Sequence, residues 1–288
     1  MSNFARPALC LAFLCGFAVP VFAEPLPVVA SFSILGDMVR QVGGDAVRVT
    51  TLVGADGDAH SYQTTSTDLK TVSKAQLTFV NGLGFDPWAE KLVKASDGKA
   101  RLVVASAGIT PHTMTEDDDH AHDHGHTDPH AWQDLRNGKT YVANITTALV
   151  AALPDQAEAI RQRAATYTAQ IEAEAAAVRA AIATVPEAQR LIITSHDAFG
   201  YFGAAYGVRF AAPYGLSTES EPSARAIGKL VSQIKKEGVT TVFIENMSNP
   251  KLIEQLGKDG GATIGKTLYA DALSPPDGPA PNYLAMFR

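Results

Sequence analysis

An unbroken helical pattern over residues 155–184 limits the possible architectures more than any other part of the chain. Its apolar residues recur at helical spacing and keep one face hydrophobic: Ile160, Ala164, Tyr167, Ile171, Val178 and Ile182. A helix of this length is unusual in a globular protein, and at about 1.5 Å per residue it would span roughly 45 Å. Pro154 precedes the pattern and Pro186 closes it. We therefore predict a rigid linking helix over residues 155–185, long enough to connect two lobes.

Short apolar segments alternate with helical segments on both sides of this helix. The predicted strands are residues 28–32, 47–53, 77–80 and 102–105 before it, and 191–194, 208–212, 241–244 and 262–268 after it. The predicted helices are residues 34–42, 137–153, 223–237 and 251–257. Strands separated by helices favour parallel sheets. The expected fold is therefore α/β, with mostly parallel sheets in a first lobe over residues 24–154 and a second lobe over residues 186–288.

The first 23 residues have the features of a secretory signal peptide. Arg6 supplies a positive charge, residues 8–21 form an apolar stretch, and Ala23 ends a small-residue cleavage pattern. The stretch is short for a membrane-spanning helix, so a retained N-terminal anchor is the less favoured alternative. We predict cleavage after Ala23 and a mature protein located in the periplasm.

Both cysteines, Cys10 and Cys15, lie inside this predicted signal peptide. The mature chain would then contain no cysteine, so it could form no disulfide and offer no thiolate ligand. Neither cysteine follows a convincing lipobox, and lipid attachment is not expected. The formal charge of −6 gives no electrostatic basis for binding nucleic acid.

Histidine and aspartate are concentrated in residues 112–129, which we predict to be a loop because the segment has almost nothing apolar to bury. Five loop histidines are candidates for an auxiliary metal site that captures zinc and passes it on: His112, His120, His122, His124 and His126. The alternative is a passive linker that binds metal without affecting transport.

Four further residues border regular elements in polar surroundings. His60 and His196 follow predicted strands, Asp271 follows the strand predicted to end at residue 268, and His130 precedes a helix. Open α/β sheets bind ligands in the crevice at the carboxyl ends of their strands, where three of the four are placed. Because each lobe supplies two of them, a cation held by all four would lie in the cleft between the lobes.

Three imidazoles and one carboxylate suit Zn²⁺, which favours tetrahedral coordination at about 2.0–2.2 Å from nitrogen and oxygen. Imidazole also serves copper, nickel and iron, and affinity alone ranks Cu²⁺ above Zn²⁺. Mn²⁺ prefers more oxygen ligands, so three histidines argue against it. The alternative is that the histidines are separate structural residues that cap loops.

Five segments resemble the cluster A-I (cluster 9) substrate-binding proteins of zinc and manganese ABC importers, the ZnuA-like family. They are GDAHSY at 57–62, DPHAW at 128–132, SHDAFGYF at 195–202, EPS at 221–223 and DAL at 271–273. The resemblance implies two α/β lobes joined by a long rigid helix, with the metal in the cleft. It implies that His60, His130, His196 and Asp271 are the ligands. Manganese members usually have a carboxylate at the third position, so His196 points to zinc.

The function that the resemblance implies is a monomeric periplasmic receptor that binds zinc with high affinity and delivers it to the permease of an ABC importer. A periplasmic zinc metallochaperone is a candidate donor, and no enzymatic activity is expected. A receptor for manganese or another divalent metal is the alternative, as is a periplasmic zinc buffer or adhesin. A zinc hydrolase is less favoured, because the chain has no HExxH or GxSxG motif and no obvious general base.

Supporting roles can be assigned to residues around the candidate ligands. Ligating histidines usually donate their second N–H to a carboxylate or carbonyl, and the candidates are Asp197, Glu219, Glu221 and Glu245. The aromatic residues beside the ligands are expected to pack in the core: Trp132, Phe199, Tyr201 and Phe202. Because a rigid helix resists wide hinge closure, we expect metal release to involve local loop changes around His60 or Asp271.

Overall fold

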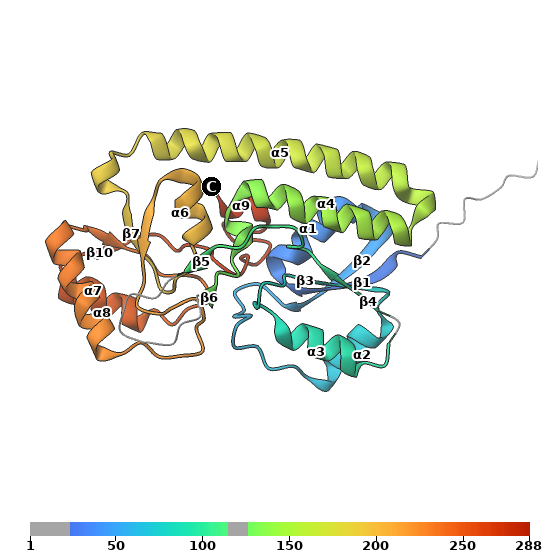
Figure 1. Ribbon diagram of the computed structural model, residues 1–288, viewed down its shortest axis with the longest axis horizontal. Coiled ribbons are helices and arrows are strands. Elements are labelled where there is room, and N and C mark those ends of the chain that lie inside the picture. The colour runs from blue at the N-terminus through green and yellow to red at the C-terminus, as the bar shows by residue number, and fades with distance from the viewer. Residues whose placement is uncertain (1–23, 99, 115–125) are drawn as a thin grey trace, which may run out of the picture.

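The computed structural model describes residues 24–98, 100–114 and 126–288 and contains two α/β lobes spanned by one long helix (Figure 1). The predicted signal peptide, with Cys10 and Cys15, lies outside the described residues, as do His120, His122 and His124. Within the described parts of the chain, no helix is both long and apolar enough to cross a membrane.

The first lobe is built on a four-stranded parallel sheet. Its strand order is β2 (Val47–Val53), β1 (Leu26–Phe32), β3 (Leu77–Val80) and β4 (Arg101–Val104). Because successive side chains of a strand point to opposite faces, Val28 and Phe32 enter the main core below helices α1 (Ser33–Gly43) and α4 (Leu135–Ala152). Val29 instead packs on the other face, against α2 (Ser66–Lys74) and α3 (Pro87–Ala95).

The second lobe repeats this plan with shorter strands. Its parallel order is β10 (Thr263–Ile264), β9 (Thr241–Val242), β7 (Leu191–Ile193) and β8 (Arg209–Ala211). Helices α7 (Ala224–Glu237) and α8 (Lys251–Gly260) cover one face through a separate small core, and α6 (Gly200–Tyr206) packs beside the main core. Two parallel sheets in two lobes confirm the predicted fold class.

Helix α5 (Ala157–Ala183) runs along both lobes and lies beside α4, to which the 3-10 turn η3 (Pro154–Gln156) connects it (Figure 1). Its buried face includes Ile160, Tyr167 and Ile171. Its 27 residues span roughly 40 Å at about 1.5 Å each. Arg163 fixes it to the end of α1, donating from Nε and Nη2 to the carbonyls of residues 42 and 43 at 2.8 and 2.7 Å.

The chain returns to the first lobe at its C-terminal end, although the sequence places all of residues 186–288 in the second lobe. Leu273 donates its backbone N–H to Ser33 Oγ at 2.9 Å, and Tyr283 donates its own to Asp37 Oδ2 at 2.9 Å. The short helix α9 (Tyr283–Met286) carries Tyr283 into the main core. This return provides a second connection between the lobes.

Several elements are additions to the predicted set. Helix α2 begins at a capping box in which Thr65 and Asp68 satisfy each other's backbone N–H groups. Strands β5 (Thr113–Met114) and β6 (His126–Thr127) pair antiparallel at the base of the histidine-rich loop. The remaining 3-10 turns are η1 (Gly44–Ala46), η2 (Ala131–Gln133) and η4 (Glu187–Gln189).

Candidate metal centre

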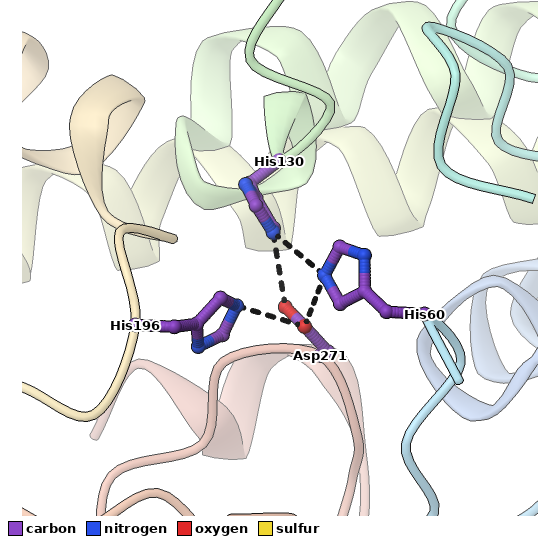
Figure 2. Close-up of side chains that lie close together, drawn as sticks. All are labelled: His60, His130, His196 and Asp271. Atoms are coloured by element: carbon purple, nitrogen blue, oxygen red, sulfur yellow. Dashed lines mark hydrogen bonds and ion pairs between the residues drawn. The ribbon is translucent and has the colours of Figure 1, made fainter. Parts of the chain in front are cut away.

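The structure brings His60, His130, His196 and Asp271 together between the lobes (Figure 2). His60 follows β2 and His130 immediately precedes η2, so both belong to the first lobe. His196 follows β7, and Asp271 follows a parallel bridge between Glu245 and residue 268 in the second lobe. Each residue offers one ligand atom, and these atoms all lie within 4.8 Å of one another.

The shorter separations between these atoms are close to those expected around a bound divalent cation. Asp271 Oδ2 lies 3.1 Å from Nε2 of both His60 and His196, and Asp271 Oδ1 lies 3.6 Å from His130 Nε2. The Nε2 atoms of His60 and His130 are 3.3 Å apart. Ligand atoms around tetrahedral zinc, with bonds of about 2.0–2.2 Å, are separated by roughly 3.3–3.6 Å.

Three of these atoms are buried without a well-directed hydrogen bond to any described residue. They are Nε2 of His196 and both carboxylate oxygens of Asp271. Both residues are fully buried, and leaving a polar group in this condition costs free energy. A cation placed among the four side chains would satisfy all three atoms, so this donor set fits a divalent metal.

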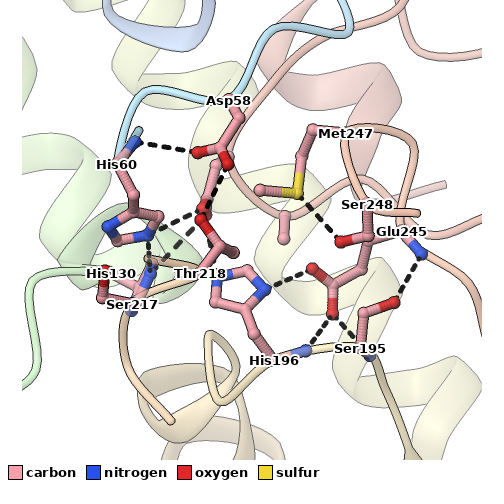
Figure 3. A network of polar contacts seen from close by, with 12 residues as sticks. Asp58, His60, His130, Ser195, His196, Ser217, Thr218, Glu245, Met247 and Ser248 are labelled. Atoms are coloured by element: carbon pink, nitrogen blue, oxygen red, sulfur yellow. Dashed lines mark hydrogen bonds and ion pairs between the residues drawn. The ribbon is translucent and has the colours of Figure 1, made fainter. Parts of the chain in front are cut away.

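Two of the histidines are held by a buried carboxylate in the same way, and Figure 3 shows one of these pairs, His196 with Glu245. Asp128 Oδ1 accepts from the backbone N–H of His130 at 2.9 Å and from its ring Nδ1 at 2.8 Å. Glu245 accepts from the ring Nδ1 of His196 through Oε2 and from its backbone N–H through Oε1, the latter at 3.0 Å. With the hydrogen on Nδ1, the Nε2 lone pair of each ring is free to bind a metal.

His60 is held differently. Asp58 Oδ1 accepts from its backbone N–H at 2.8 Å, but no described residue forms a hydrogen bond with its ring Nδ1. The ring packs edge-on against Phe85, with centroids 4.9 Å apart, and the side chain is 6% exposed. It lines a cleft of about 1670 Å³ to which both lobes contribute residues, including Trp88 and Tyr214. His60 is therefore the ligand candidate on the solvent side of the cluster.

The charges of the cluster reinforce one another. Burial alone would lower the pKa of His196, but the nearby charges of Glu245 and Asp271 outweigh burial and hold this pKa well above the ordinary 6.5. Burial alone would raise the pKa of Asp271, but the charges of His196 and His130 hold it well below the ordinary 3.8. Without a metal, the charges of Glu245 and Asp271 therefore favour the protonated form of His196.

Hydrogen bonds from side chains to backbone carbonyls position the segments that carry Asp271 and His130. The indole Nε1 of Trp132 and the amide Nε2 of Gln133 donate to the carbonyl of Ala270 at 2.9 and 2.8 Å, which fixes the residue before Asp271. The side-chain amide of Asn81 donates to the carbonyl of residue 129 at 2.9 Å and so supports the turn before His130. Asp271 of one lobe and His130 of the other are thus held in one rigid frame.

Of the four predicted supporting carboxylates, Glu245 contacts a ligand histidine directly. Glu221 accepts from Tyr214 Oη at 3.0 Å, and Glu219 is exposed at the cleft. Burial raises the pKa of Asp197, whose backbone N–H donates to the carbonyl of residue 215 at 3.1 Å. None of these three forms a hydrogen bond with a described ligand ring.

The remaining predicted residues lie around the cluster. His112 stacks on Tyr201 with ring centroids 4.0 Å apart and an interplanar angle of 8°, and it is not one of the four clustered residues. The backbone of His126 is part of β6. Trp132 and Tyr201 are buried, Phe199 stacks on Phe210, and Phe202 is partly buried beside the main core.

Sequence reasoning missed Asp58 and Asp128 as supports for the ligands, although a signal for both was present. Each aspartate stands two residues before a candidate ligand, in Asp58-Ala59-His60 and Asp128-Pro129-His130. Aspartate at this spacing accepts the backbone N–H two residues on, which is the hydrogen bond that the structure contains in both cases.

Two parallel α/β lobes, a helical spine and a cation-sized ligand cluster between the lobes define a substrate-binding protein for a divalent metal. The sequence model of the family described as zinc-uptake complex component A, periplasmic, matches residues 28–288. The chain therefore belongs to this ZnuA family of metal-binding proteins of ABC transporters.

Individual relatives differ in the metal that their names state. The manganese-binding lipoprotein MntA of Halalkalibacterium halodurans is 31% identical over 92% of this chain and 86% of its own length. The iron-binding protein YfeA of Yersinia pestis is 30% identical over 92% of this chain and 84% of its own. The periplasmic zinc-binding protein TroA of Treponema pallidum superposes with a TM-score of 0.83 at 27% identity, covering 92% of this chain and 95% of TroA.

Proposed function

We propose that this protein is an extracytoplasmic receptor that binds Zn²⁺ between its lobes and delivers it to the permease of an ABC importer. The observation that carries the proposal is the convergence of three imidazole nitrogens and one carboxylate, all within 4.8 Å, in a buried pocket. Zn²⁺ is the transported ligand, so the four candidate ligand residues must both bind it tightly and release it to the permease.

The donor set is the basis for choosing zinc. Nitrogen donors suit zinc, whereas manganese favours sites dominated by carboxylate, carbonyl and water oxygens. Relatives named for manganese, iron and zinc share the fold, so the fold does not select the metal and the side chains must. Here three of the four candidate ligands are histidines, and two have carboxylates behind them that strengthen imidazole as a ligand.

The site also argues for a receptor rather than a hydrolase. A catalytic zinc keeps a coordination position open for water, whereas a closed site fills all four positions with protein ligands. His60, His130, His196 and Asp271 together supply four donors. We propose further that residues 1–23 are a cleaved signal peptide, which would place the receptor in the periplasm.

Metal analysis of the protein purified without added metal, followed by competition between Zn²⁺ and Mn²⁺ for the metal-free protein, tests the choice of metal. We expect one zinc per chain and displacement of bound manganese by a stoichiometric amount of zinc. Retention of manganese against equimolar zinc would refute zinc as the cargo. The His60→Ala, His130→Ala, His196→Ala and Asp271→Ala variants serve as controls, because each should lose the tight stoichiometric binding.

The role of the histidine-rich loop is a separate proposal. Its candidate ligands are His112, His120, His122, His124 and His126, and we propose that they capture zinc weakly and pass it to the cleft. Deleting residues 112–126 should slow zinc acquisition from a chelator without changing the final affinity. Unchanged acquisition would identify the loop as a passive linker.

A further inference from the structure

The loop that carries His60, residues 54–65, is joined to the second lobe by two of its own carboxylates. Asp58 Oδ2 accepts from Thr218 Oγ1 at 2.7 Å, and Asp56 Oδ1 accepts from the side-chain amide of Asn246 at 2.7 Å. Asp56 has a positive φ of 54°, and the loop contains Gly54 and Gly57. The loop has little regular structure of its own. Its position is fixed by these contacts with the other lobe and by Trp88 of its own lobe, whose Nε1 donates to the carbonyl of Ala59 at 2.9 Å.

Asp58 is the junction between these contacts and the metal site (Figure 3). Its Oδ1 accepts from the backbone N–H of His60 at 2.8 Å, and its Oδ2 accepts from Ser61 Oγ at 2.9 Å as well as from Thr218. One carboxylate thus joins the backbone of a candidate ligand to a hydroxyl on the opposite lobe. A movement of Thr218 away from Asp58 would remove one restraint on the group that orients His60.

This restraint matters more for His60 than for the other histidines. The rings of His130 and His196 are each fixed by a carboxylate on Nδ1, whereas no described residue hydrogen-bonds Nδ1 of His60. The orientation of the His60 ring therefore depends on its backbone and on packing against Phe85. Thr218 lies in the segment between β8 and α7, neighbours of which line the cleft beside His60.

We propose that the Asp58–Thr218 hydrogen bond is a latch between the lobes that holds His60 on the metal and sets the rate of metal release. Movement of the 212–223 segment opens the latch, and His60 is the first ligand to leave, while His130, His196 and Asp271 stay in place. Asp58 and Thr218 are positioning residues, since neither is one of the four clustered ligand candidates. The inference rests on the proposed metal-receptor function.

The test measures metal release into excess chelator by stopped flow, together with the association rate. Thr218→Val removes the hydroxyl at nearly constant volume. Because hydrogen bonds to charged groups are worth about 1.5 kcal/mol or more, release should be about tenfold faster, with association changed less than about twofold. Thr218→Ser keeps the hydroxyl and should restore slow release. Thr166→Val, which removes a hydroxyl on the exposed face of α5, is the matched remote control.

A double-mutant cycle separates the latch from a general loss of structure. Asp58→Ala should release metal faster than Thr218→Val, because it also removes the acceptor of the His60 backbone N–H. Adding Thr218→Val to Asp58→Ala should produce no further acceleration. Equal release rates for Thr218→Val and the wild-type protein would overturn the proposal, as would additive effects in the double variant.

Release is measured with zinc-loaded and with manganese-loaded protein, which separates this proposal from the choice of cargo. If the protein retains manganese in preference to zinc, zinc as cargo is refuted while the manganese release rates still test the latch. If zinc binds tightly and Thr218→Val releases it at the wild-type rate, the receptor proposal stands and the latch is refuted.

Discussion

His196 and His60 present the same Nε2 atom to the same oxygen of Asp271 at the same distance of 3.1 Å, yet the protein holds them differently. His196 is fully buried, and Glu245 contacts both its ring and its backbone N–H. His60 lies at the edge of the cleft on a loop, held through its backbone by Asp58.

The difference shows how one site can combine tight binding with release. The buried side of the site, with His196 and His130, is preorganised, because the carboxylates behind the rings fix their tautomer and orientation. The cleft side, with His60, lies on a loop and has no carboxylate behind its ring, so we expect it to move more easily. The two histidines are therefore equally distant from Asp271 but unequally rigid.

The largest effects are expected from removing each of the two histidines. His196→Ala and His60→Ala should both weaken zinc binding by roughly 300-fold, since a four-ligand zinc site is worth about 10–16 kcal/mol in total. His196→Ala should also destabilise the metal-free fold more than His60→Ala does, by roughly 3 kcal/mol, because it leaves Glu245 and Asp271 as buried carboxylates without their cation. His60→Ala should cost about 1 kcal/mol.

Chelator competition gives the affinities, and urea unfolding in excess EDTA gives the free energies of unfolding. Equal destabilisation of the metal-free protein by both substitutions would contradict the proposed division between a rigid and a movable side. The double variant His196→Ala/Glu245→Gln provides a control, because removing one of the stranded charges should recover part of the lost stability.

Smaller effects on affinity are expected from the carboxylates behind the rings. Glu245→Gln and Asp128→Asn should each weaken zinc binding about 10–100-fold, because a neutral amide supports the ligand nitrogen less well than a carboxylate. Glu221→Gln, at an exposed carboxylate bonded to Tyr214, is the matched control and should leave the affinity unchanged. Isothermal titration against a competing chelator measures all three, and wild-type affinity in Glu245→Gln would show that its contact with His196 has no role in binding.

Much of the fold could be predicted because hydrophobic periodicity was clear. Strand β3 occupies the predicted residues, and five of the six predicted apolar positions of the linking helix are buried in α5. The strands predicted over residues 241–244 and 262–268 are shorter in the structure, because the regular ladder ends with β9 and β10 and only an isolated parallel bridge between Glu245 and residue 268 continues it toward the site. Helix α2 was not predicted, although the sequence has the signal for its start: Thr65 and Asp68 stand three residues apart, the spacing of a capping box.

The site was predictable only where its signals are local. The candidate ligands border predicted elements, and the structure places them together. Contacts between distant segments had no such signal: Thr218 and Asp58 are 160 residues apart, and Trp132 and the carbonyl of Ala270 are 138 apart. Such pairs follow from how the two lobes pack, which a single sequence does not specify. The return of residues 273–288 to the first lobe was missed for the same reason.

The pH dependence provides a further test of the buried side. The raised pKa of His196 stabilises the metal-free fold fully below the unfolded value of about 6.5, and this contribution is lost as the pH rises through the folded value. The lowered pKa of Asp271 stabilises the fold above about 3.8, and this contribution is lost as the pH falls through the folded value. The contribution of this pair should therefore be greatest between about pH 4 and 6.5, as urea unfolding in EDTA would measure.

Metal binding should have the opposite pH dependence at His196, because zinc binds the neutral imidazole and the metal-free fold is stabilised by the protonated one. At pH 7 the binding of one zinc should release about one proton from His196. Calorimetry in two buffers with different ionisation enthalpies measures this number, and Glu245→Gln should reduce it by removing one of the charges that raise the pKa. Binding without proton release would show that His196 is already neutral in the metal-free protein.

The smallest effect is expected on overall shape. Helix α5 and the returning segment with Tyr283 connect the lobes at two places, and Trp132 and Gln133 join them again beside Asp271. Rigid-body closure would have to break these contacts, whereas displacement of the His60 loop breaks hydrogen bonds made by Asp58 and Asp56. Small-angle scattering should therefore give nearly equal radii of gyration with and without zinc, while hydrogen exchange in residues 54–65 should slow on binding. A marked decrease in the radius of gyration on zinc binding would show that the lobes themselves move. Movement would then not be confined to the loop that carries His60.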